Sequence, residues 1–225
     1  IVSFHFGLPD PKFVECIRAT GAKIIVTATT LKEAIFLQDN GCDAVIAQGQ
    51  EAGGHQGVFL PAEAKNRSTT LELVSQISEA VTIPVIAAGG VADQVGIRTM
   101  MTAGASGVQI GTRFLKSHES KITSLHRSIL EENHDRETAV TNVFTGRPAR
   151  GFINKLVHDL GPMNSNVQTF PMAIAALTPL RKATIGSEDF VTLWAGQSWK
   201  TGKTMSAHDI VQDLAQAFDQ HSDCD

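Results

Sequence analysis

Residues 83–90 read IPVIAAGG, an apolar run rich in β-branched side chains that ends in two glycines. Runs of the same kind read IVSFHFG, AKIIVTA, CDAVIAQG and SGVQIGT, and they start near residues 1, 23, 43 and 106. Because these runs are apolar throughout, they are typical of strands that are buried on both faces. The starts lie about 20 residues apart, except after the third run, and this rhythm is typical of βα modules. The sequence therefore predicts five parallel strands, in a sheet covered by helices or in a closed (β/α) barrel.

Helix signals stand between the predicted strands. Asp10 followed by Pro11 predicts an N-cap and a first-turn proline, and Thr30 opens a second helix. A third helix is predicted over residues 70–81 and a fourth over residues 92–104. The apolar face of the third helix is predicted to hold Leu71, Val74, Ile77 and Val81.

The βα rhythm stops beyond Thr112, and the rest of the chain has a different pattern. Residues 117–225 are predicted to form helices and loops, with helices over residues 118–132 and 206–220. No stretch of low complexity and no repeat marks a linker between the two parts. We therefore expect a mainly helical second lobe to follow the βα part.

Composition excludes several classes of protein. Hydrophobic residues make up 42% of the 225 residues and charged residues 19%, with a formal net charge of -4, which argues against disorder and against a nucleic-acid partner. The three cysteines, Cys16, Cys42 and Cys224, have no paired spacing, which argues against a disulfide framework and a zinc site. No apolar run approaches the roughly 18 residues that a membrane helix needs. We expect a protein of the reducing cytoplasm, with no membrane partner and no metal.

Glycines end two neighbouring strands, in IPVIAAGG and GVQIGT. Glycine lets the backbone approach an anion closely and point its N–H groups at it. Since (β/α)8 barrels hold a phosphate after their last two strands, the pair of loops favours a phosphate cradle. The alternative is that these glycines only make tight corners.

A histidine stands in the enlarged interval after the third strand, where residues 48–57 read QGQEAGGHQG. In parallel sheets and barrels the ligand lies at the carboxyl ends of the strands, so this loop is on the functional side. A proton-transfer group that works near neutral pH is most simply a histidine, and His55 is the candidate. The alternative is a surface histidine in a turn.

Six stretches together resemble a known family. In order they read HFGLP, QGQEAGGHQG, IPVIAAGGVAD, GASGVQIGTRFL, TNVFTGRPARG and LWAGQ, and the succession resembles the FMN-dependent nitronate monooxygenases, formerly called 2-nitropropane dioxygenases. The resemblance runs from Ile1 to about Gln216. QGQEAGGHQG and QIGT are shared in part with flavin-dependent enoyl-ACP reductases, whereas NVFTGRPARG and LWAGQ favour the nitronate enzymes.

The resemblance implies a fold and a set of site residues. It implies a TIM (β/α)8 barrel that binds FMN, of which residues 1–116 form the C-terminal part. Residues 117–225 are then a helical second lobe that includes the last barrel helices. About three βα units that the family has before its last five strands are expected to be absent. The catalytic residue is predicted to be His55, and the predicted cofactor contacts are Gln48, Gly53, Gly89, Gly90, Gln109, Ile110, Gly111 and Thr112.

The implied reaction is the oxidation of a nitronate or nitroalkane with O2, which gives a carbonyl compound and nitrite. The partners are then a small nitro compound and O2, and a homo-oligomer is compatible with this interpretation. One alternative is an NAD(P)H-dependent enoyl-thioester or quinone reductase on the same scaffold. The other is a truncated flavin-fold protein without catalytic activity. Arg147 and Arg150 either bind the substrate's anionic group or tie the second lobe to the barrel, and we favour this structural role.

Overall fold

The computed structural model describes residues 1–60, 68–132 and 135–219, so Cys224 lies outside the described residues. The chain forms two compact units. The first contains the described residues of the ranges 1–50, 57–110 and 211–225, and the second those of 51–56 and 111–210. The division into a barrel part at 1–116 and a lobe at 117–225 stays a prediction.

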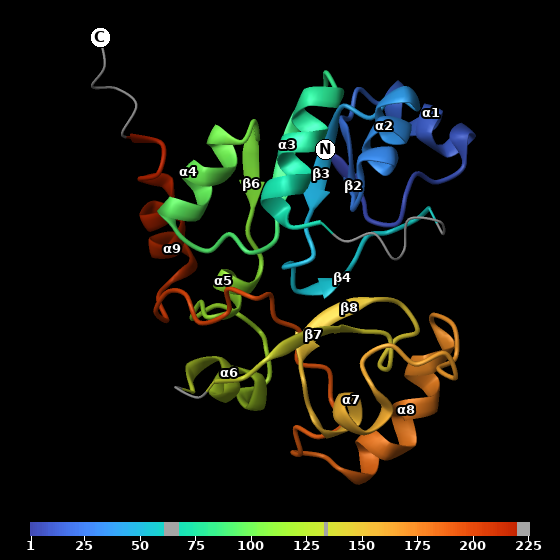
Figure 1. Cartoon of the computed structure of the whole chain (residues 1–225), viewed down its shortest axis with the longest axis vertical. Coiled ribbons are helices and arrows are strands. Elements are labelled where there is room, and N and C mark those ends of the chain that lie inside the picture. The colour runs from blue at the N-terminus through green and yellow to red at the C-terminus, as the bar shows by residue number, and fades with distance from the viewer. Residues whose placement is uncertain (61–67, 133–134, 220–225) are drawn as a thin grey trace. The chain divides into compact units, whose positions relative to one another are not determined.

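The first unit is built on a parallel sheet (Figure 1). Its strands run in the order β1 (Val2–Phe4), β2 (Ile24–Ala28), β3 (Ala44–Gln48), β5 (Val85–Ala88) and β6 (Gly107–Gln109). Every neighbouring pair in this order is parallel. The prediction of five parallel strands is confirmed. The order ends at β1 and β6, so these five strands by themselves do not close a barrel.

Burial along the strands follows their place in the sheet. All five residues of the central strand β3 are buried, whereas the two end strands β1 and β6 are partly exposed. A central strand has neighbours on both edges and helices on its faces, so it can be apolar throughout. The continuous apolar runs in the sequence are therefore explained by two-sided burial.

Four helices alternate with these strands, namely α1 (Pro11–Ala19), α2 (Leu31–Asp39), α3 (Thr70–Ala80) and α4 (Gln94–Thr102). The predicted caps are present, because the Asp10 side chain accepts from the Lys12 amide and the Thr30 side chain accepts from the Glu33 amide. Each cap satisfies a backbone donor that the first turn of a helix leaves without a partner. The first four helices are confirmed.

The predicted apolar face of α3 is partly wrong. Leu71 is 43% exposed, and the buried residues of the helix include Leu73 and Thr70. Both lie with Val74 and Ile77 on one side of the helix, and Leu71 lies outside that stripe. Apolarity alone selected Leu71, whereas the angular position on the helix decides which residue is buried.

The second unit contains an antiparallel sheet that the sequence did not predict. Its strands run in the order β4 (Gly54–His55), β8 (Ala149–Phe152) and β7 (Thr138–Thr141). The prediction that residues 117–225 hold only helices and loops is therefore wrong at β7 and β8. Arg150 obscured the pattern, since a charged residue is rare inside a buried strand. It is buried because its guanidinium donates to the carbonyl and the hydroxyl oxygen of Thr138, at 3.0 Å each.

The helices of the second unit are α5 (Thr112–Leu115), α6 (Ser124–Glu131), α7 (Lys155–Leu160) and α8 (Met172–Ala183). The helix predicted over residues 118–132 is α6, which starts later than predicted because Thr123 caps it. The last predicted helix is α9 (Ala207–Ala215). In α9, Asp213 accepts through its carbonyl oxygen from the side chain of Gln94, at 2.9 Å.

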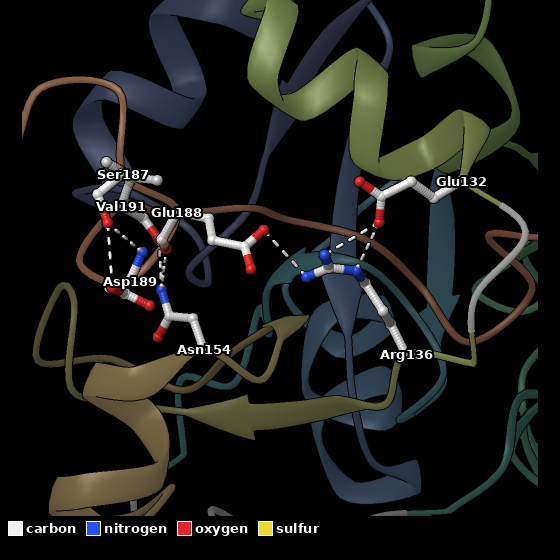
Figure 2. Close-up of polar contacts among 7 residues, drawn as sticks. All are labelled: Glu132, Arg136, Asn154, Ser187, Glu188, Asp189 and Val191. Atoms are coloured by element: carbon white, nitrogen blue, oxygen red, sulfur yellow. Dashed lines mark hydrogen bonds and ion pairs between the residues drawn. The ribbon is translucent and has the colours of Figure 1, made fainter.

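Polar contacts hold the segment that follows α8 in the second unit (Figure 2). Arg136 lies between two carboxylates, at 2.9 Å from Glu132 and 3.1 Å from Glu188. The Asn154 amide donates to the carbonyl oxygens of Glu188 and Val191, at 2.8 and 3.0 Å. These bonds anchor the chain just before Leu193, whose carbonyl accepts from the Phe152 amide of β8.

Acid is expected to destabilise the second unit through His126. This side chain on α6 is 8% exposed, and burial lowers its pKa below the usual 6.5, opposed by a hydrogen bond with the Trp194 backbone. Within the described part of the chain, Nε2 of His126 has no hydrogen-bond partner. As pH falls, the unfolded chain therefore binds the proton at a higher pH than the folded chain does. The stability that neutral His126 allows is fully present above pH 6.5, and it is lost as pH falls from 6.5 toward the folded-state pKa.

Urea unfolding at pH values above and below 6.5 measures this effect. In the His126→Gln variant we expect the free energy of unfolding to change less between the two conditions. The exposed His208 on α9 gives the matched control, His208→Gln, which should retain the dependence of the parent protein. An undiminished dependence in His126→Gln would contradict the assignment.

Candidate active site

Two predicted positions of the first unit, Gln48 and Gln109, lie at the carboxyl ends of strands on either side of β5. The register pairs Gln48 of β3 with Ala88 of β5, and Ala88 with Gln109 of β6. The glycine turn 89–90 therefore starts directly beside the turn that Ile110 begins. The structure brings these predicted residues together at one edge of the sheet.

The two glycines after β5 adopt backbone conformations that other residues rarely take. Gly89 has a φ of 110° and Gly90 a φ of 69°. The carbonyl of Gly89 accepts from the Thr70 hydroxyl at 2.9 Å, which ties the turn to the start of α3. Both interpretations of these glycines agree with this geometry, because a tight corner made of residues without Cβ also gives an anion access to the backbone.

The Gln48 side chain is buried and fixed. Its Oε1 accepts from the Gly57 amide at 2.8 Å, which holds the chain as it returns from β4. This bond assigns the orientation of the carboxamide, so Nε2 is the atom that would donate to a flavin. Gln48 thus has a structural role in addition to the predicted one.

In the second unit, Gly53, Thr112 and Gly196 lie together. A Cβ on Gly53 would lie 2.5 Å from the Gly196 amide nitrogen and 3.0 Å from the Thr112 hydroxyl. The same hydroxyl accepts from the Gly196 amide at 2.9 Å. The glycine at position 53 is therefore required by close packing of the chain.

Gly111 differs from Gly53, because no atom of residues 1–60, 68–132 or 135–219 lies within 4 Å of the position that its Cβ would take. It precedes α5 with a φ of -110°, which any residue can adopt. Neither packing nor backbone strain explains a glycine here. A glycine here is compatible with the predicted approach of a phosphate to the backbone, which stays a prediction.

His55 lies in the short strand β4, and not in the flexible loop that the sequence predicted. It pairs with Ala149 of β8, and its Nε2 lies 3.0 Å from the hydroxyl oxygen of Thr145. Two aromatic rings flank it, with centroid distances of 5.7 Å to Trp194 and 6.0 Å to Phe170. The imidazole is held in one place, as a base that must meet a reacting atom requires.

The sequence did not identify the neighbours of His55. Thr145 and Trp194 stand in NVFTGRPARG and LWAGQ, which indicated the family but suggested no role for either residue. Phe170 gave no signal at all. Arg147 lies over the Phe170 ring at 5.4 Å from its centroid. The buried Arg150 bonds Thr138 within the second unit, so a role in joining the lobe to the barrel stays a prediction.

The residues at the strand ends fit the phosphate of FMN. In the first unit two adjacent parallel strands end side by side, and the backbone amides of the turn after β5 belong to Gly89 and Gly90, which carry no Cβ. The chain continues from Ile110 into Gly111, which leaves open space where a Cβ would stand. Such a donor set suits an anion and supplies no metal ligand. Among the described residues, no group of three or more His, Cys, Asp or Glu side chains could hold a metal ion.

Comparisons with known proteins show which family the chain resembles. A sequence model of the family described as nitronate monooxygenase matches residues 1–217. The chain is 39% identical, over 95% of its length, to a probable nitronate monooxygenase of Staphylococcus saprophyticus, of which it covers 61%. The structure resembles that of a nitroalkane oxidase from Streptomyces ansochromogenes, with a TM-score of 0.89 and 38% identity over 97% of this chain and 64% of the other.

FabK from Thermotoga maritima is a further similar structure, with a TM-score of 0.76 and 30% identity over 97% of this chain and 68% of the other. Among the curated relatives that it matches, the chain spans about three fifths of their length. No helix in the described ranges is long and apolar enough to cross a membrane.

Proposed function

This chain belongs to the nitronate monooxygenase family of oxidoreductases, and we propose that it serves the FMN-dependent oxidation of nitronates and nitroalkanes. The products are a carbonyl compound and nitrite. The observation that carries the proposal is the register that aligns Gln48, Ala88 and Gln109 at the carboxyl ends of three neighbouring strands.

Each unit contributes its own residues to this proposal. In the first unit, backbone amides of the turns after β5 and β6 hold the phosphate, and Gln48 contacts the flavin. In the second unit, Gly111 and Thr112 complete the phosphate loop, and His55 acts on the nitro compound. The full set of cofactor contacts is Gln48, Gly53, Gly89, Gly90, Gln109, Ile110, Gly111 and Thr112.

FMN supplies the electron transfer from the nitronate to O2, and the chain supplies binding and proton transfer. With a neutral nitroalkane, His55 removes the proton from the α-carbon as a general base. With a preformed nitronate, the protonated imidazole donates a hydrogen bond to a nitro oxygen. The rings of Trp194 and Phe170 flank His55 and present apolar surface beside it, which favours a small organic substrate.

The proposal is tested by incubating the FMN-loaded protein with a nitronate in air and measuring nitrite. We expect nitrite to form in step with oxygen consumption, and absorbance of bound flavin in the purified protein. Failure to bind FMN would support the non-catalytic alternative. Bound FMN without nitrite would favour a reductase.

The reductase alternative is favoured by one observation, the similarity to FabK. On that alternative a reduced pyridine nucleotide is the electron donor. Anaerobic mixing of the FMN-loaded protein with NADH or NADPH decides between the two. We expect little bleaching of the flavin absorbance, and rapid bleaching would favour the reductase.

Substitution at Gly111 is expected to weaken FMN binding without unfolding the chain. Because the space at its Cβ is open and its φ is ordinary, Gly111→Val should fold, but the side chain should block the approach of a phosphate. We expect the dissociation constant for FMN to rise about tenfold or more, as for the loss of a charge-assisted hydrogen bond. Flavin fluorescence titration measures it.

The matched control is Gly107→Val on β6, where a Cβ also meets nothing within 4 Å. Gly107 stands before the strand end, so its variant should bind FMN as the parent does. Equal affinity for FMN in both variants would remove Gly111 from the phosphate site.

The proposal extends to the whole protein. We propose that the parallel sheet is an arc of a TIM-type (β/α)8 barrel. We also propose a cytoplasmic location, for which the free thiols of Cys16 and Cys42 are the support.

A further inference from the structure

The Thr145 hydroxyl makes three hydrogen bonds, and together they determine what it offers to His55. It donates to the carbonyl oxygen of Arg147 at 3.2 Å and accepts from the Arg147 amide at 3.3 Å. The third partner is Nε2 of His55 at 3.0 Å. Thr145 is 5% exposed, so these bonds are shielded from water.

A hydroxyl has one hydrogen and two lone pairs. The carbonyl oxygen of Arg147 can only accept, so it takes the single hydrogen of Thr145. The Arg147 amide can only donate, so it uses one lone pair. With its hydrogen on the Arg147 carbonyl, Thr145 presents its second lone pair to His55, and this arrangement favours a hydrogen on Nε2.

Resting on the proposed function, we infer that Thr145 is a positioning residue that holds neutral His55 as the Nε2–H tautomer and makes Nδ1 the catalytic base. The α-proton of the nitroalkane moves to Nδ1, and the C–H electron pair becomes the C=N bond of the nitronate, whose charge rests on the nitro oxygens. The imidazolium is then held through Nε2–H by Thr145, and Nδ1–H faces the nitronate.

The turn that carries Thr145 is built to fix this arrangement. Gly146 has a φ of 85°, and a Cβ on it would lie 2.4 Å from the Gln168 carbonyl oxygen and 2.5 Å from the Phe170 amide nitrogen. Only glycine allows that approach. The same turn therefore positions both Thr145, which bonds His55, and the backbone of Phe170, whose ring packs edge-on against His55.

Nitrogen NMR of the imidazole tests the inference without any turnover. The full chain is labelled with 15N-histidine, and the signals of His55 are identified by their absence from His55→Asn. At a pH where the ring is neutral, we expect Nε2 to carry the hydrogen, which exchanges slowly with water, and Nδ1 to show the shift of an unprotonated nitrogen. A hydrogen on Nδ1 would overturn the inference.

Two variants separate the hydrogen bond from the shape of the side chain. Thr145→Val keeps the volume and removes the acceptor, so the Nε2 hydrogen should exchange fast and kcat/KM for nitroalkanes should fall on the order of tenfold. Thr145→Ser restores the hydroxyl and should restore both readouts. Turnover of preformed nitronates, which need no base, should fall less.

The outcomes distinguish this inference from the proposed function. A protected Nε2 hydrogen in a protein without activity on nitro compounds would refute the function and leave the assigned tautomer standing. Wild-type exchange and wild-type kcat/KM in Thr145→Val would overturn the positioning role. If Thr145→Val fails to fold, the parent spectrum and the Thr145→Ser spectrum still decide the tautomer.

Discussion

Replacing His55 with asparagine is expected to lower kcat/KM for neutral nitroalkanes about 10²- to 10⁴-fold, the range that a general base contributes. Asparagine keeps a polar side chain on β4 but cannot take up a proton near neutral pH. FMN binding should change little, because the predicted phosphate contacts lie on other strand ends. Preformed nitronates have already lost the α-proton, so their turnover should fall far less. Steady-state rates with paired nitroalkane and nitronate substrates measure the difference.

The matched control for His55→Asn is His158→Asn on α7, whose side chain is 82% exposed. This change removes an exposed histidine of the second unit that is not a predicted site residue, and both substrates should react as with the parent protein. Equal losses on nitroalkane and nitronate in His55→Asn would remove the assignment of a base. They would leave His55 as a group that only holds the substrate.

The parallel sheet and its strand ends could be predicted because the signals are local. A strand buried on both faces must be apolar over its whole length, so five short windows of sequence sufficed. Since parallel strands all end at one edge, the glycines after β5 were expected at that edge, whereas Gln48 was named by the resemblance to the family. The register of β3, β5 and β6 then placed the residues where the pattern implied.

The surroundings of His55 could not be predicted, because they arise from distant parts of the chain. Thr145 is 90 positions from His55, and Trp194 comes from a third segment. The strands β7 and β8 are only four residues long, and Arg150 interrupts the apolar pattern of β8. Short strands with polar residues depend on their partners, and the sequence does not show which segments pair.

The burial of Glu33 is the feature that the sequence indicated least. Substitution of Glu33 is expected to give the largest loss of stability. It stands in LKEAIFLQDN, where it resembles an exposed helix residue, yet it is completely buried. One oxygen accepts from the Thr29 amide and hydroxyl at 2.7 and 2.8 Å. The other accepts from the amides of Phe59 and Leu60, at 2.7 and 2.9 Å. The carboxylate therefore ties the chain that follows β4 to the turn before α2.

Glu33→Gln is expected to lower the free energy of unfolding strongly, although it changes the volume little. Glutamine has one oxygen and one NH2 group. In either orientation its NH2 group, which can only donate, faces two of the four donors that the carboxylate oxygens now accept from. The cost is about 1–3 kcal/mol for each buried donor that is left without an acceptor. Glu33→Ala should cost more, because it also removes the second oxygen and leaves a cavity. Urea unfolding followed by circular dichroism measures both variants.

Glu15 supplies the matched control, since Glu15→Gln makes the same chemical change on the exposed surface of α1. We expect its free energy of unfolding to stay within about 0.5 kcal/mol of the parent, as is usual for a surface substitution. If Glu33→Gln were as stable as Glu15→Gln, the four hydrogen bonds would not account for burying a carboxylate there. A charge buried without such bonds would be strongly unfavourable, so the difference between these two variants measures what the bonds at Glu33 contribute.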